Sequence, residues 1–220
     1  QAFSSWLNQL NLDVVWSYVV IVAASMLCIM FHEVSHGVVA LKLGDTTARD
    51  AGRLTFNPLK HIDIWGLLMM AIFRFGWAKP VPIDMRNFKH PMRDMAITAA
   101  AGPISNVILA FFALCVRAGA VYVYQKTGGM ISDFIITFTE YTAILSIGLA
   151  VFNVIPIPPL DGSHIVESFL PRRLAWQYSR LGRWGFVILI VLLATGLLGA
   201  ILGPLIEWSS ELAFSFYRLF

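Results

Sequence analysis

Long apolar stretches separated by short polar segments dominate this sequence. Three are long enough to cross a membrane as helices, and a C-terminal stretch adds a fourth helix or a helix pair; they cover residues 14–43, 92–124, 134–156 and 184–220. A helix needs about 20 mainly apolar residues to span roughly 30 Å of hydrocarbon. The pattern therefore predicts an all-α polytopic membrane protein, with about four to five transmembrane helices in one domain over residues 1–220. Residues 205–220 are expected either to span or to lie in the interface.

The segment between the first two predicted helices, residues 45–91, follows a different pattern. Its prolines and glycines have the spacing of short extended segments and exclude helix interiors and central strands. The apolar stretch 64–75 within it is too short to span a bilayer. We expect a small re-entrant β-element here, with a strand edge at 53–56 or 81–84 that holds an extended substrate. A plain amphipathic loop is the alternative.

Composition supports the membrane class and limits the partners. Hydrophobic residues make up 58% and charged residues 13% of the chain, which excludes an ordinary soluble domain. Lysine and arginine concentrate in residues 42–93 and 172–183, so the positive-inside rule places both regions in the cytoplasm and the N-terminus outside. Basic residues are not interleaved with exposed aromatic residues, and no nucleic-acid partner is expected. We interpret Cys28 and Cys115, which lie in apolar stretches, as packing residues.

Three ionisable side chains interrupt the first apolar stretch near its end. His32 and His36 stand four residues apart and therefore share one face of a helix, where their ring nitrogens can converge on one metal ion. Glu33 lies beside that face. The pattern H-E-x-x-H predicts zinc bound by the two histidines, with Glu33 as the general base.

A zinc hydrolase needs a third protein ligand and one open position. The candidates near the predicted helices are His61, Asp63, Asp84, His90, Glu140, Asp161, His164 and Glu167. Asp161 is favoured because it follows prolines that cannot continue a helix and precedes Gly162, which permits a sharp turn. The predicted topology also places Asp161 on the same side of the membrane as the end of the first helix.

The HEVSH element on a spanning helix, together with NVIPIPPLDG at 153–162, resembles the site-2 protease family of intramembrane zinc metalloproteases, peptidase family M50. Segments 52–63, 76–82 and 101–106 are also similar to the compact prokaryotic branch, which has no PDZ or CBS domain. The resemblance implies that His32, His36 and Asp161 bind one Zn²⁺ and that Glu33 is the base and then the acid. It also implies that the substrate is a transmembrane helix, cut within or near the membrane.

Three further polar residues are weaker candidates for the site. The resemblance implies that Asn153 contacts the substrate backbone or the developing oxyanion. Asn106 follows Gly102-Pro103, where a role in helix packing or in satisfying a kink is favoured over substrate binding. His164 is expected either to support the metal ligands from outside or to lie at the surface.

The favoured function is a zinc-dependent intramembrane endopeptidase, acting in regulated intramembrane proteolysis or signal-peptide clearance, as the family suggests. The expected setting is a prokaryotic cytoplasmic membrane, with the active site near the cytoplasmic side and lipid and a transmembrane-helix protein as partners. A homo-oligomer is a further possible assembly that the sequence neither predicts nor excludes. The alternatives are a catalytically inactive zinc-binding scaffold of the same fold, with four protein ligands, and a metal transporter, with further polar ligands along a path.

Overall fold

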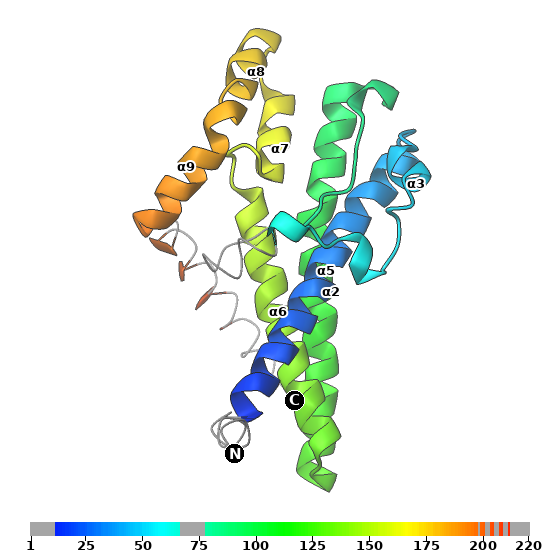
Figure 1. Ribbon diagram of the computed structural model, residues 1–220, viewed down its shortest axis with the longest axis vertical. Helices are drawn as coiled ribbons and strands as arrows, with labels where there is room; N and C mark the ends of the chain where they lie inside the picture. Colours follow the sequence, from blue (N-terminus) through cyan, green and yellow to red (C-terminus); the bar gives the residue numbers. More distant parts are fainter. Residues whose placement is uncertain are drawn as a thin grey trace, which may run out of the picture.

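A computed structural model describes residues 12–66 and 78–197, with isolated positions up to 211, and every regular element among them is helical (Figure 1). The elements are α2 (Leu12–Lys42), α3 (Thr47–Asp50), η1 (Pro58–Lys60), η2 (Met85–Asn87), α5 (Pro91–Thr127), α6 (Met130–Val154), α7 (Asp161–Phe169), α8 (Arg172–Ser179) and α9 (Gly182–Ala194). The predicted all-α class agrees with this description.

Three described helices, α2, α5 and α6, are long and apolar enough to cross a membrane. They lie where the sequence predicts the first three spans, but α6 begins at Met130 rather than 134 because the turn needs only Gly128 and Gly129, both with positive φ. The predicted total of four to five spans is not confirmed. Helix α9 has 13 residues, and most of 205–220 lies outside the described residues.

The three long helices form the bundle that positions the site. Chain direction alternates, so the C-terminal ends of α2 and α6 lie at the same end as the start of α5 (Figure 1). Small side chains allow α5 and α6 to pack closely: Ala110 and Ala113 meet Ala143. Both cysteines are free, and buried Cys28 accepts a hydrogen bond from the Ser146 hydroxyl at 3.1 Å. The packing interpretation is wrong for Cys115, whose side chain is exposed on the outer surface of α5.

The described part of the predicted β-element contains no strand, and residues 67–77 lie outside the described residues. Residues 78–84 are extended, but Pro80 and Pro82 have no N–H, and three of the other N–H groups bind outside any strand ladder. The Lys79 N–H donates to the His61 carbonyl at 2.9 Å, and the Val81 and Asp84 N–H groups donate to the carboxylates of Glu33 and Asp45, each at 2.8 Å. This segment therefore lacks the row of unpaired N–H groups that a strand edge offers to a peptide.

Two buried side chains fasten this extended segment to the end of α2. Asp45 accepts hydrogen bonds from the Asp84 N–H and from the Asn87 amide at 2.7 Å. The Arg53 guanidinium donates to the carbonyls of Lys79 and Pro80 at 2.6 and 3.2 Å. Residues 78–84 consequently lie along α2 at the level of the HEVSH element.

Candidate metal centre and active site

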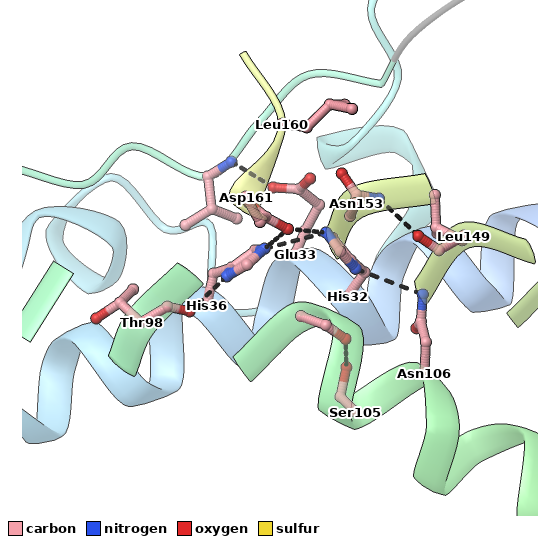
Figure 2. A network of polar contacts seen from close by, with 12 residues as sticks. His32, Glu33, His36, Thr98, Ser105, Asn106, Leu149, Asn153, Leu160 and Asp161 are labelled. Carbon is pink, nitrogen blue, oxygen red and sulfur yellow. Dashed lines mark hydrogen bonds and ion pairs between the residues drawn. The ribbon is translucent and has the colours of Figure 1, made fainter. Parts of the chain in front are cut away.

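Two imidazoles face each other on the inner side of α2. His32 and His36 are both buried, and their Nε2 atoms lie 3.0 Å apart (Figure 2). Their rings meet edge to face with centroids 4.6 Å apart. The four-residue spacing on a continuous helix thus brings the two ring nitrogens together, as H-E-x-x-H predicts.

The third candidate ligand arrives from the far side of the proline-rich loop. Asp161 is the first residue of α7, and its Oδ2 lies 3.0 Å from Nε2 of His32 and 3.2 Å from Nε2 of His36. Gly162 makes this approach possible, since a Cβ there would lie 2.1 Å from the Val154 carbonyl oxygen at the end of α6. Within the described ranges, His32, His36 and Asp161 form the one group of three or more such residues able to hold a metal.

Several of the remaining candidates for the third ligand have other partners. Asp84 pairs with Arg86 at 2.6 Å, Glu140 with Arg117 at 3.0 Å, and His61 binds the Thr55 carbonyl at 2.8 Å. His164 lies 3.7 Å from the Glu167 carboxylate on the same helix. The geometry therefore separates Asp161 from the alternatives that the sequence leaves open.

The donor set fits Zn²⁺. Two ligand atoms of a tetrahedral zinc with bonds of about 2.0–2.1 Å lie about 3.3 Å apart, close to the separations of 3.0 to 3.2 Å here. Asp161 Oδ2 is buried without a well-aligned hydrogen bond, as expected of an atom that faces a shared cation. Burial alone would raise the pKa of the Asp161 carboxyl, but the two imidazoles hold this pKa at about 2. The carboxylate is therefore ionised at neutral pH, the form in which it can bind a metal.

Helix α5 passes directly beneath the two imidazoles, and Gly102 is its point of closest approach. A Cβ at this position would lie 2.4 Å from Nε2 of His36 and 2.6 Å from Cε1 of His32. The small residues at 99–102 predict close helix packing in general, but the sequence does not reveal that the packing partner is the pair of imidazoles. Gly102 is thus a site residue that sequence reasoning missed.

The outer nitrogens of both rings also have neighbours on α5. Nδ1 of His36 donates to the Thr98 carbonyl at 2.7 Å, which leaves its Nε2 lone pair facing the other ligands. Nδ1 of His32 lies 3.4 Å from the amide nitrogen of Asn106 (Figure 2). Asn106 is fully buried behind this imidazole, a location that does not favour the substrate-binding alternative.

Glu33 lies on α2 beside the two histidines, and Figure 2 shows its carboxylate on the side of the site that faces residue 81. Its Oε2 accepts the Val81 N–H at 2.8 Å. Gly37, one turn further along α2, admits Val81 to this position: a Cβ there would lie 3.0 Å from Cγ1 of Val81 and 2.4 Å from Cδ2 of Leu54. The extended segment therefore orients the carboxylate, through a backbone group that leaves no sequence signal.

Asn153 lies in the last turn of α6, on the Glu33 side of the site (Figure 2). One hydrogen of its amide nitrogen bonds to the Leu149 carbonyl at 2.9 Å, which leaves the second N–H and Oδ1 for another partner. Its substrate role stays a prediction. The same holds for His164, which pairs with Glu167 and has no described hydrogen bond to the three candidate ligands.

Comparison with known proteins identifies the family. The model of peptidase family M50 matches residues 116–194. A relative from Bacillus subtilis (strain 168), "Putative zinc metalloprotease YwhC", is 36% identical over 179 residues, covering 80% of each chain. The chain belongs to peptidase family M50. A second relative, "Putative zinc metalloprotease Rip2" of Mycolicibacterium smegmatis, is 27% identical over 201 residues, covering 90% of this chain and 75% of its own. No solved structure matches the chain significantly.

The M50 match and the site geometry complement each other. The matched residues 116–194 include Asn153 and Asp161 but not the HEVSH element. The 3.0 and 3.2 Å contacts between Asp161 and the two histidines connect the matched part of the chain to α2. The site of this M50 protein therefore combines residues of α2 with residues from the part of the chain that the family model matches.

Proposed function

We propose that this M50 protein is a zinc-dependent intramembrane endopeptidase that hydrolyses a peptide bond in the transmembrane segment of a membrane-protein substrate. The observation that carries the proposal is the convergence of His32, His36 and Asp161 beside Glu33, in a bundle of three helices able to span a membrane. Three protein ligands leave one position for water and substrate, as a catalytic zinc requires.

His32, His36 and Asp161 are the residues that would hold the ion. Bound zinc would act as a Lewis acid, polarising the scissile carbonyl and making a water molecule more acidic. Glu33 takes a proton from the attacking water and later gives it to the leaving amine. The Val81 N–H holds the Glu33 carboxylate at the edge of the ligand group for both proton transfers.

The depth of the site agrees with cleavage inside the membrane. His36 and His32 lie six and ten residues before Lys42, the basic end of α2, which corresponds to about 9 and 15 Å at 1.5 Å per residue. With the basic segments in the cytoplasm, the N-terminus lies outside and the site lies within the cytoplasmic half of the bilayer. Water reaches it from the cytoplasmic end and the substrate from the lipid.

A helical substrate must become extended before its carbonyls are accessible. Asn153 is suited to hold the extended backbone, because its Oδ1 and second N–H complement a peptide group. Asn153 lies directly before the proline-rich loop that positions Asp161. Transmembrane segments of signalling proteins and signal-peptide remnants are the two substrate classes that the family suggests.

Cleavage by the purified protein in liposomes tests the proposal, with both substrate classes offered as synthetic transmembrane peptides. Glu33→Gln should retain zinc and lose roughly 10²–10⁴-fold in rate. Glu140→Gln is the matched control, since it makes the same change in another half-buried carboxylate of the bundle and should cleave normally. Cleavage by Glu33→Gln at the wild-type rate would contradict the mechanism. Zinc flux into the liposomes without cleavage would favour the metal transporter. Zinc binding without cleavage and without zinc flux would favour the inactive scaffold.

A further inference from the structure

The amide of Asn106 is a buried polar group with an unsatisfied atom. The residue lies on spanning helix α5 with 0% of its surface exposed, and its Oδ1 has no hydrogen-bond partner. Its amide nitrogen lies 3.4 Å from Nδ1 of His32. An unpaired amide oxygen costs free energy inside a membrane bundle. We therefore expect Oδ1 to have a hydrogen-bond partner in the functional state, and the ring of His32 is the neighbouring polar group.

The two faces of the amide suit two tautomers of His32. With the amide nitrogen toward the ring, Nδ1 of His32 is an acceptor, so the ring proton sits on Nε2 and faces Asp161 Oδ2 at 3.0 Å. Binding a metal through Nε2 requires the other tautomer, in which Nδ1 carries the proton and needs an acceptor. A half-turn of the amide brings the unsatisfied Oδ1 to that place, because the two amide atoms exchange positions without moving the helix.

We propose that Asn106 is a positioning residue for the metal centre: its Oδ1 accepts the Nδ1–H of His32 and so presents the Nε2 lone pair to the ion. The inference rests on the proposed zinc site. In this proposal, the Asn106 amide orients the His32 ring in the way that the Thr98 carbonyl, at 2.7 Å from Nδ1, orients the His36 ring. The two rings differ in one respect: His36 is oriented by a fixed backbone acceptor and His32 by a side chain that substitution can remove.

Zinc affinity of the full-length protein in detergent, measured by competition with a chelator, tests this role. Asn106→Leu keeps the approximate volume and removes the acceptor, and should weaken zinc binding about 10- to 100-fold. Asn106→Asp keeps an acceptor at the same place and should bind within about threefold of wild type, a small change on that scale. Thr142→Val is the control, because it removes a different buried polar group of the bundle, a hydroxyl that bonds within its own helix.

The outcomes separate the possible roles. If Asn106 serves only packing, Asn106→Leu will change thermal stability and leave zinc affinity at the wild-type value, which overturns the inference but not the zinc site. Absence of zinc binding in the wild type would overturn both. Should Asn106→Leu fail to fold, Asn106→Ala removes the acceptor without steric conflict, and zinc affinity equal to wild type in that variant would equally overturn the inference.

Discussion

Helix α5 packs its two halves by different means. In the site half, residues 91–106, it approaches α2 so closely that Gly102 has no room for a Cβ. In the outer half, residues 107–127, alanines make the contact with α6, and a Cβ added to Gly119 would meet no atom of a neighbouring element within 4 Å. The site half is therefore sensitive to a single methyl group, whereas the outer half tolerates one.

The same contrast holds for charge. The site half of α5 packs against two imidazoles of α2, which lie within hydrogen-bonding distance of the Asp161 carboxylate, an arrangement that is costly without a cation. The outer half has a closed ion pair, in which the Arg117 guanidinium donates to the Glu140 carboxylate at 3.0 Å. Three ligand atoms that converge on one point indicate a binding site, whereas a cation paired with a carboxylate indicates a structural role.

The largest effect is expected from Gly162→Ala. The new methyl would lie 2.1 Å from the Val154 carbonyl oxygen, and backbone cannot yield as a flexible side chain does. The start of α7 must move, carrying Asp161 away from the histidines, and zinc affinity should fall roughly 100-fold or more. Gly148→Ala on α6, with nothing within 4 Å, is the control. Equal zinc affinity in the two variants would show that α7 does not deliver a ligand.

Gly102→Ala should be the next most damaging change. Its methyl would lie 2.4 Å from His36 Nε2, and the imidazoles must rotate away from the shared centre. Zinc affinity should decrease about 10- to 100-fold. Gly119→Ala, the same change in the outer half of α5, should bind zinc normally and be slightly more stable, by up to about 1 kcal/mol. Reversal of this order would contradict the contrast between the halves.

A smaller and more selective effect is expected from Val81→Pro. Proline removes the N–H that holds Oε2 of Glu33 at 2.8 Å but leaves the three candidate ligands untouched. The kcat for cleavage should fall about 10-fold, part of the factor that a general base contributes, with zinc content unchanged. Val81→Ala keeps the N–H and separates this effect from lost packing. A variant that loses zinc together with activity would place the role of Val81 in folding instead.

Glu140→Gln should affect stability alone. It leaves Arg117 facing a neutral amide, and we expect a loss of about 1–2 kcal/mol in unfolding free energy, less than for a fully buried pair because 37% of the Glu140 side chain is exposed. Thermal denaturation in detergent measures this loss. A change in zinc affinity would argue against the separation of the two halves.

The sequence predicted the parts of this site that depend on local periodicity. His32 and His36 follow from helical spacing, and Asp161 follows from the prolines that end α6 and the glycine that permits the turn. The spans of α2, α5 and α6 follow from apolar length. These features are set by neighbours in the chain, so one sequence is enough to find them.

Features that depend on which faces meet were not predictable. Nothing in the spacing indicates that Gly102 and Asn106 face the imidazoles, because that depends on how α5 is rotated against α2. The β-element predicted from Gly and Pro spacing is not confirmed: among the described residues, the side chains of Glu33, Asp45 and Arg53 bind backbone groups of residues 79–84. Such side-chain competition for backbone groups has no signature in local composition.

X-ray absorption at the zinc edge tests the central claim most directly, because it reports the atoms bound to the ion. For the wild-type protein we expect two imidazole nitrogens and oxygen ligands at about 2.0–2.2 Å, with no sulfur. Asp161→Ala should lose most of its zinc or replace the carboxylate oxygen with water. A sulfur ligand, a third imidazole, or an unchanged spectrum with full zinc content in Asp161→Ala would contradict the assignment of His32, His36 and Asp161 as the metal centre.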